Sequence, residues 1–220
     1  MKSPRLAIFD LDGTLLNTIG DLAVGCNYML RLRNLPEHTY EEYCHFVGNG
    51  ITRLVERAIP EQLRTPEYVA AARRDFVEYY YENIDHKTVP YEGVHDLLLR
   101  LAAEGVTLAV ASNKFDAGTK RLIGRFFPDV CFSAVYGNRD GFPLKPDAAV
   151  LRLIMEECGF EPSQTYMVGD SGVDMQTAHA AGVRSIGVSW GFRAREELVE
   201  SGAEVIADSA DEVFDTIVGV

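Results

Sequence analysis

The sequence predicts an α/β protein, a doubly wound parallel sheet with a Rossmann-like core, into which an all-helical segment is inserted. Short, continuous apolar runs recur along most of the chain, and a helical pattern follows each of them after a turn. Continuous apolar runs are typical of strands buried on both faces, as in a parallel sheet. One long interval breaks this alternation and contains no convincing strand.

The apolar runs are the strand candidates, and the one at 134–136 is the weakest of them. They lie at residues 6–9, 108–111, 134–136, 166–168, 185–188 and 204–206. Apolar side chains at helical spacing come between and after these runs. The predicted helices are residues 92–104, 116–126, 146–158, 174–181, 193–201 and 210–218. Strands that alternate with helices in this way indicate βαβ units and one parallel sheet.

The interval from residue 17 to residue 86 is predicted to be all-helical. No glycine occurs between Ile51 and the end of this interval. Apolar side chains fall at helical spacing at residues 69, 72, 76, 79 and 80. We therefore expect a core domain made of residues 1–16 and 87–220 and an inserted helical domain of residues 17–86. The hinges between them are expected near residues 16–18 and 86–90.

Composition restricts the possible functions. The 220 residues contain 21 Lys and Arg against 33 Asp and Glu, a formal net charge of −12. Nucleic acids and anionic membranes are bound mainly through positive charge, so neither is an expected partner. We expect no membrane span and no signal peptide. The four cysteines are scattered without a C-x-x-C pair, which indicates free thiols in the cytoplasm.

Two carboxylates, Asp10 and Asp12, follow the first predicted strand. Residues two apart on a strand point the same way, and ligands bind at the carboxyl edge of such a sheet. Two acids this close repel each other unless a cation or shared proton intervenes, which suggests Mg²⁺. Gly13 leaves room for a ligand, and Thr14 offers N–H and hydroxyl donors. The alternative is an ordinary Asp-Gly turn before a helix cap.

Polar residues also follow the later strands. Ser112 and Asn113 come at a strand-to-helix turn, where they can bind an anion or simply cap the helix. Pro146 is expected in the first turn of the next helix, which would fix Lys145 beside the same edge of the sheet. A lysine taken alone is usually a solvated surface residue. The position that Pro146 would fix favours a functional role for Lys145.

Asp170 directly follows another buried strand, and Asp174 lies one helical turn later on the same side. Asp170 is a candidate metal ligand, and the alternative is a capped turn. Together the strand ends supply acids, a hydroxyl, an amide and a lysine. This set can provide a nucleophile, metal ligands, phosphate donors and a counter-charge, so it favours phosphoryl transfer.

These motifs resemble the four signature motifs of the haloacid-dehalogenase-like hydrolases. They are D-L-D-G-T-L at 10–15, S-N at 112–113, K-P at 145–146 and G-D-S-x-x-D at 169–174, and their order and separation match as well. The helical insertion after the first motif is similar to the cap domain of the phosphoglycolate-phosphatase-like branch. Residues 15–18, 47–50 and 169–182 look closest to that branch.

The resemblance implies a Mg²⁺-dependent phosphatase that works through an aspartyl-phosphate. Asp10 would be the nucleophile, and Asp12 would protonate the leaving group and then activate water. The Asp10 and Asp170 carboxylates and the Asp12 backbone carbonyl would hold Mg²⁺, and Asp174 would orient them. The implied phosphate-binding groups belong to Thr14, Ser112, Asn113 and Lys145.

Substrate choice is expected to depend on the cap, which would close over the site. Gly48, Asn49 and Gly50 could offer N–H groups to an anionic substrate, and Arg53 could pair with a carboxylate such as that of glycolate. A solvated arginine on a cap helix is the alternative. The expected substrate is a small phosphorylated metabolite, 2-phosphoglycolate first, and the protein is expected to be a monomer or a homodimer.

Other hypotheses stay open. A pyrophosphatase, a nucleotidase or a sugar phosphatase would suit the same core chemistry. The resemblance disfavours a dehalogenase, because Asp12 is kept, and a sugar-phosphate mutase, because Leu22 stands where that branch has a histidine. A phospho-accepting signalling domain would be shorter, and a binding protein with a dead site would not need every catalytic residue type. His45 has no assigned role, and Trp190 is interpreted as a packing residue.

Overall fold

The computed structural model describes residues 5–219 and contains a six-stranded sheet with the order β5-β4-β1-β6-β7-β8. The strands are all parallel, and they are β1 (Arg5–Phe9), β4 (Val106–Phe115), β5 (Ala134–Asn138), β6 (Thr165–Gly169), β7 (Arg184–Val188) and β8 (Val205–Ala207). The strand order reverses at β1, which lies between β4 and β6. Ligands bind beside such a reversal, at the carboxyl ends of the strands.

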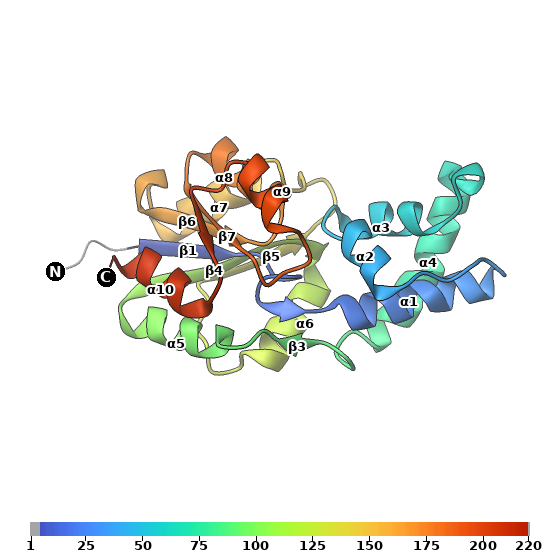
Figure 1. Ribbon diagram of the computed structural model, residues 1–220, viewed down its shortest axis with the longest axis horizontal. Helices are drawn as coiled ribbons and strands as arrows, with labels where there is room; N and C mark the ends of the chain where they lie inside the picture. The colour runs from blue at the N-terminus through green and yellow to red at the C-terminus, as the bar shows by residue number, and fades with distance from the viewer. Residues whose placement is uncertain (1–4, 220) are drawn as a thin grey trace.

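Helices cover both faces of the sheet (Figure 1). One face carries α5 (Val94–Ala103), α6 (Asp116–Phe126) and α10 (Ala210–Val218), and the other carries α7 (Ala149–Cys158) and α8 (Gly172–Ala181). The remaining short helices of this part are α9 (Arg195–Glu200) and the 3₁₀ turn η2 (Pro162–Gln164). Ala7 and Phe9 of β1 pack into one apolar cluster, and Leu6 and Ile8 pack into the other. Burial on both faces explains the continuous apolar run of this strand.

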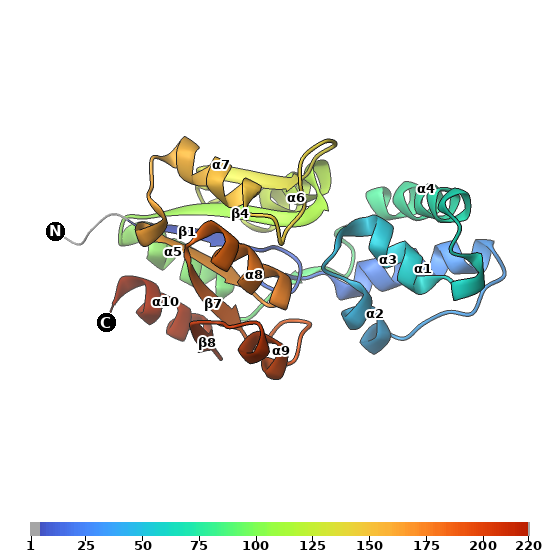
Figure 2. The same ribbon diagram turned by 90° about the horizontal axis from the view of Figure 1, so that it is seen from above.

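A group of helices is inserted between the two-residue strands β2 (Leu16–Asn17) and β3 (Val89–Pro90). Its elements are α1 (Ile19–Leu32), α2 (Tyr40–Phe46), α3 (Gly50–Ala58), η1 (Glu61–Leu63) and α4 (Pro66–Glu82). Figure 2 shows these helices side by side beyond the carboxyl ends of the sheet strands. β2 and β3 pair in antiparallel fashion, so the two connecting segments run together.

The parallel α/β sheet is confirmed, and within the sheet and the helices that cover it the differences from the sequence prediction lie at the ends of elements. β4 continues past Ala111 to Phe115 with an irregular register. The helix expected from residue 146 begins at Ala149, and a cis Lys145–Pro146 bond lies in the turn before it. The physical reason is that the Asn113 side chain binds both the N–H and the carbonyl of Lys145, which holds this segment in a turn.

Residues 1–4 and 220, which the expected core domain includes, lie outside the described residues. Within residues 5–219, no helix has both the length and the apolar character that crossing a bilayer requires. The β2–β3 pair was not predicted, because two residues per strand are too few to produce a recognisable apolar pattern.

Asp21, in the first turn of α1, ties the two connecting segments to each other. Its buried carboxylate accepts hydrogen bonds of 2.8–2.9 Å from the N–H groups of Lys87 and Thr88 and from the Thr88 hydroxyl. Thr88 directly precedes β3, so one side chain fixes the start of the helical insertion against its end. Hydrogen bonds to an ionised carboxylate are stronger than those between neutral groups.

We predict that Asp21→Ala lowers the free energy of unfolding by about 2–4 kcal/mol, because it leaves the buried N–H of Thr88 and the part-buried N–H of Lys87 without their acceptor. Urea unfolding followed by circular dichroism measures this change. Glu78→Ala is the matched control on the exposed face of α4, where we expect a change within about 0.5 kcal/mol. An Asp21→Ala midpoint equal to that of the wild type would contradict the role of this carboxylate.

Candidate active site

Asp10 lies at the carboxyl end of β1, where the chain leaves the sheet in a tight turn. Its N–H donates to the Val168 carbonyl of β6 at 2.9 Å, so the residue stays fixed to the neighbouring strand. The Leu11 carbonyl then accepts hydrogen bonds from the next turn, from the N–H groups of Thr14, Leu15 and Leu16. This turn holds the Asp10 side chain, 8% exposed, at the edge of the sheet.

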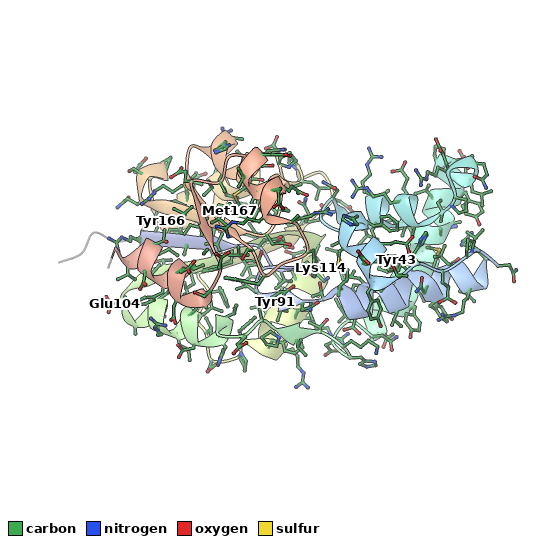
Figure 3. The ribbon with its side chains drawn as sticks, in the orientation of Figure 1. Tyr43, Tyr91, Glu104, Lys114, Tyr166 and Met167 are labelled. Atoms are coloured by element: carbon green, nitrogen blue, oxygen red, sulfur yellow. The ribbon has the colours of Figure 1, made fainter. Side chains whose placement is uncertain are left out.

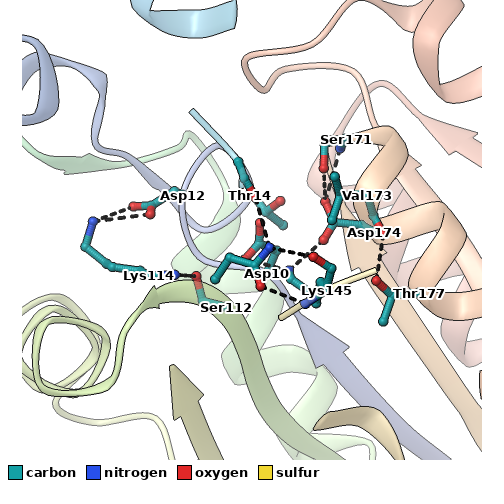
Figure 4. A network of polar contacts seen from close by, with 12 residues as sticks. Asp10, Asp12, Thr14, Ser112, Lys114, Lys145, Ser171, Val173, Asp174 and Thr177 are labelled. Atoms are coloured by element: carbon teal, nitrogen blue, oxygen red, sulfur yellow. Dashed lines mark hydrogen bonds and ion pairs between the residues drawn. The ribbon is translucent and has the colours of Figure 1, made fainter. Parts of the chain in front are cut away.

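Two carboxylates, those of Asp10 and Asp174, contact Lys145 at this edge (Figure 4), and a third, that of Asp170, lies beside them. Carboxylate oxygens of Asp10, Asp170 and Asp174 lie within 4.8 Å of one another. The Lys145 ammonium lies 2.9 Å from Asp10 Oδ1 and 2.6 Å from Asp174 Oδ1. The N–H and the hydroxyl of Ser171 donate to the other oxygen of Asp174 and fix its orientation. Of the acids predicted after β1 and β6, Asp10 and Asp174 are therefore in contact with the predicted lysine.

Burial and mutual repulsion shift the pKa values of these groups. Burial, together with Asp174 and Asp12, raises the pKa of Asp10 to about 7 even though Lys145 opposes the shift. Burial and the neighbouring Asp174 and Asp10 hold the pKa of Asp170 well above its ordinary value. Burial alone would lower the pKa of Lys145, but the contacts with Asp10 and Asp174 outweigh it and raise that pKa. With all three carboxyl groups ionised, the site would hold more negative charge than its lysine offsets, so the folded protein favours protonated acids there.

The residues of this cluster fit a divalent cation with oxygen ligands. Asp10 Oδ1 is buried and receives no well-directed hydrogen bond from the described residues, although the Lys145 ammonium lies 2.9 Å away. Both Asp174 oxygens are already bound, by Lys145 and Ser171, which suits an orienting role. Hard carboxylate oxygens in a buried, negatively charged site are the donors that Mg²⁺ prefers.

Two glycines pack directly against Asp170. A Cβ on Gly13 would lie 2.3 Å from Asp170 Oδ2, and the φ angle of Gly13 is +90°. A Cβ on Gly191 would lie 2.2 Å from the Asp170 Cβ. The neighbouring Phe192 N–H donates to Asp170 Oδ2 at 2.8 Å. The Asp170 carboxylate thus occupies space that only residues without a side chain leave free.

Asp12 carries its carboxylate away from Asp10 and toward Lys114 (Figure 4). β1 ends at Phe9, so the strand alternation expected to align Asp10 with Asp12 does not extend that far. Asp12 Oδ1 accepts a hydrogen bond of 2.7 Å from the Thr18 hydroxyl and one of 3.0 Å from Lys114 Nζ. Lys114 was not predicted as a site residue, although a lysine directly after a buried strand and beside Ser112-Asn113 was a usable signal.

Ser112 and Asn113 lie inside β4, near its end, and not in a turn after the strand as expected. The Ser112 hydroxyl accepts from the Lys114 N–H at 3.3 Å. The Asn113 side chain donates to the carbonyls of Lys145 and Gly48 at 2.9 and 3.0 Å and accepts from the Lys145 N–H at 2.8 Å. Asn113 therefore positions the lysine and also touches the helical insertion, two contacts that the sequence did not indicate.

Thr14 supports Asp170, and its donors are already used inside the protein. Its hydroxyl lies 3.4 Å from Asp170 Oδ1, and its N–H donates to the Leu11 carbonyl. We expected both donors to face a ligand, but neither does, because the turn after β1 directs Thr14 back toward the protein. Trp190 packs on the same turn, and its indole N–H donates to the Thr14 carbonyl at 3.1 Å.

A cavity of ≈ 40 Å³ lies between the acids and the helical insertion. Besides Tyr80, the insertion lines it with apolar side chains and two glycines, namely Leu22, Val47, Gly48, Gly50, Ile51 and Leu54. Of the described residues, the basic side chains that line it are Lys114 and Arg193, both outside the insertion. The loop containing Gly48 and Gly50 therefore faces the site as expected, but the insertion brings no cation to it.

Among the described residues, Arg53 does not line this cavity. Its side chain is 63% exposed and pairs with Glu56 at 2.5 Å, because it projects from the outer side of α3. The Asn49 side chain accepts from Arg57 at 2.8 Å instead of facing the cavity. Arg193, which was not predicted, donates to the carbonyls of Cys44 and Val47, both at 2.7 Å, and fastens this loop to the core.

Comparison with known proteins agrees with the family that the sequence motifs resemble. The family model of the haloacid dehalogenase-like hydrolases matches residues 7–188. The chain is 33% identical over 210 residues to a phosphoglycolate phosphatase of Haemophilus influenzae, covering 93% of this chain and 94% of that protein. It is 35% identical over 210 residues to one of Pseudomonas putida, covering 93% and 77%. A crystal structure from Lactobacillus delbrueckii, provisionally assigned as a phosphoglycolate phosphatase, superposes with a TM-score of 0.92 at 31% identity and covers 98% of this chain and 99% of its own.

Mg²⁺ is predicted to raise the Tm, by about 5–10 °C at 100 times its Kd near pH 8, and by less near pH 5.5. The raised pKa values of Asp10, to about 7, and of Asp170 mean that the folded protein keeps protons that the unfolded chain releases near 3.8. Without metal, stability therefore falls as the pH rises between these values, and Mg²⁺ replaces the lost protons. Thermal unfolding in Mg²⁺ and in EDTA tests this, and an equal gain at both pH values would contradict it.

Gly13→Ala is predicted to weaken Mg²⁺ binding at least about 10-fold, because the added methyl group displaces the Asp170 carboxylate. Isothermal titration with Mg²⁺ measures the affinity. Gly141→Ala is the matched control, since Gly141 also has a positive φ, +75°, but has no atom within 4 Å of an added Cβ. If both variants bind Mg²⁺ equally well, the close approach of Gly13 to Asp170 has no role in the site.

Proposed function

The chain belongs to the haloacid dehalogenase-like hydrolases and is a phosphatase of that family, and we propose that it uses Mg²⁺ to hydrolyse small phosphate monoesters, with 2-phosphoglycolate as its substrate. The observation that carries this proposal is the buried Asp10 carboxylate with Lys145 at 2.9 Å and Asp170 beside it. A carboxylate next to an ammonium and a cation site is arranged to attack a negatively charged phosphorus centre.

Asp10 is the proposed nucleophile. Its carboxylate oxygen forms a bond to phosphorus while the bond to the leaving oxygen breaks, which gives an aspartyl-phosphate. Lys145 offsets charge on Asp10 and on the phosphoryl group, and Asp174 holds this lysine in place through the contact of 2.6 Å. When bound, Mg²⁺ supplies further positive charge at a phosphoryl oxygen. Asp10, Asp170 and the Asp12 backbone carbonyl would hold it.

Asp12 is the proposed general acid and base. It gives a proton to the leaving oxygen and then takes one from the water that attacks the aspartyl-phosphate, which releases phosphate and restores Asp10. The Thr18 hydroxyl and the Lys114 ammonium fix its carboxylate in the structure. The Ser112 hydroxyl and the Asn113 N–H are the groups proposed to hold the phosphoryl oxygens.

We propose that residues 17–86 act as a cap domain on a core of residues 1–16 and 87–220. Support comes from the paired strands β2 and β3, which form a narrow connection between the helical insertion and the sheet. The loop around Gly48 faces the acids and is bound by Asn113 and Arg193. A cap in this position would exclude water from the reacting groups and complete the substrate site.

The proposed substrate, 2-phosphoglycolate, agrees with the names of the relatives. Pyrophosphate and small sugar phosphates are the alternatives within the same chemistry.

We also propose a cytoplasmic location. All four cysteines are free thiols in the structure, which supports it.

Asp10→Asn is predicted to reduce kcat for 2-phosphoglycolate at least about 1,000-fold, because an amide is a poor nucleophile. Its Tm should not fall, since the change relieves repulsion among buried acids. Phosphate release with Mg²⁺ measures the activity, with pyrophosphate, a nucleoside monophosphate and a sugar phosphate assayed in parallel. The exposed Asp140→Asn is the control. Mg²⁺-dependent hydrolysis by Asp10→Asn at the wild-type rate would disprove the proposed nucleophile.

A further inference from the structure

Lys114 is a buried cation between the sheet and the helical insertion, as Figure 3 shows. Its side chain is 2% exposed, and its ammonium lies 3.0 and 3.2 Å from the two oxygens of Asp12. The Tyr80 hydroxyl of α4 lies 2.7 Å from the same ammonium. Lys114 also lines the cavity, so it is close to any substrate bound there.

We propose that Lys114 is a specificity residue, which binds a carboxylate carried by the leaving group and so selects phosphorylated small hydroxy acids. This inference rests on the proposed function and deepens it, because it names the group that recognises the acid. It also replaces Arg53, which lies outside the cavity, as the cation for that carboxylate.

The position of Asp12 fixes what Lys114 can reach. To protonate the leaving oxygen, Asp12 must come within hydrogen-bond distance of it. Lys114 is bound to that same carboxylate, at 3.0 Å. A group attached one or two atoms beyond the leaving oxygen therefore comes next to the ammonium. In a 2-hydroxy acid, the carboxylate is such a group.

The charges at this end of the cavity also require a cation. A substrate carboxylate placed beside Asp12 without a cation would meet a like charge at short range. A lysine already bridges two carboxylates in the same site, since the Lys145 ammonium lies 2.9 Å from Asp10 and 2.6 Å from Asp174. An ammonium has three donors and can bridge two carboxylates. Lys114 would bridge Asp12 and the substrate in the same way, by keeping its contact with Asp12 Oδ1 and exchanging the longer one, 3.2 Å to Asp12 Oδ2, for the substrate carboxylate.

The other groups around the cavity do not compete for this role. The insertion lines it with apolar side chains such as Leu22, Ile51 and Leu54. The guanidinium of Arg193 is committed to the carbonyls of Cys44 and Val47. Among the described residues that line the cavity, Lys114 is thus the cation placed beside the proposed general acid.

Tyr80 gives the helical insertion a part in this recognition. Its ring stacks on Phe76 with centroids 5.0 Å apart and meets Phe115 edge-on at 6.4 Å. These contacts fix the hydroxyl that accepts from Lys114. Tyr80 is therefore a positioning residue, which keeps the ammonium at the end of the cavity when the helices lie against the core.

The test compares two substrates that differ by the carboxylate alone. 2-Phosphoglycolate carries it, and ethyl phosphate has a methyl group in its place. For Lys114→Met we expect the ratio of kcat/KM for 2-phosphoglycolate to that for ethyl phosphate to fall about 10- to 100-fold, the size of a lost charge-assisted hydrogen bond, mainly through KM. Any general effect on Asp12 acts on both esters and cancels in the ratio.

Arg53→Met is the matched control, because it removes a positive charge outside the cavity and should leave the ratio unchanged. Tyr80→Phe keeps the packed ring and should lower the ratio less than Lys114→Met does, so it serves if Lys114→Met does not fold. A ratio that stays at the wild-type value in the folded variants overturns the inference while leaving the phosphatase proposal intact. A wild-type protein that hydrolyses neither ester overturns both.

Discussion

Repulsion among buried carboxylates at the carboxyl edge of the sheet is the constraint on which the rest of the site depends. Asp10, Asp170 and Asp174 place oxygens within 4.8 Å of one another. Such a cluster is stable only where positive charge and directed donors offset it. Lys145 supplies the charge, and the strand reversal at β1 brings the ends of β1, β4 and β6 close enough for this residue to touch two of the acids.

The sequence was sufficient to predict the sheet and the positions of the acids, because buried parallel strands have continuous apolar runs and their ends meet at one edge. It was not sufficient for side-chain directions beyond a strand end. Asp12 turns toward Lys114 because β1 stops at Phe9, and an alternation rule contains no information on that point. Contacts between distant segments, such as Asn113 with Gly48, have no local pattern at all. Arg53 projects from the exposed face of α3, and the apolar spacing of the buried Leu54, Val55 and Ala58 was a usable signal of that.

Three core residues that contact the insertion share one direction of hydrogen bonding, whereas Thr18 of the insertion donates the other way, to Asp12. The core supplies the donors, from Asn113, Lys114 and Arg193, and the insertion supplies carbonyls and the Tyr80 hydroxyl as acceptors. Asn113 binds Lys145 with the same side chain that reaches Gly48. The Asn113 side chain that orders Lys145 therefore also binds the helical insertion.

An acidic protein that binds an anionic ester cannot rely on long-range attraction. The net charge of −12 opposes the approach of the substrate, but salt screens exposed charges beyond about 8 Å at physiological ionic strength. Buried groups are screened much less. Lys145 and Lys114, each with a side chain 2% exposed, are screened little by salt, and Lys114 lines the cavity. Affinity must then come from short contacts inside the site, which makes the placement of two buried lysines more important than the charge of the whole surface.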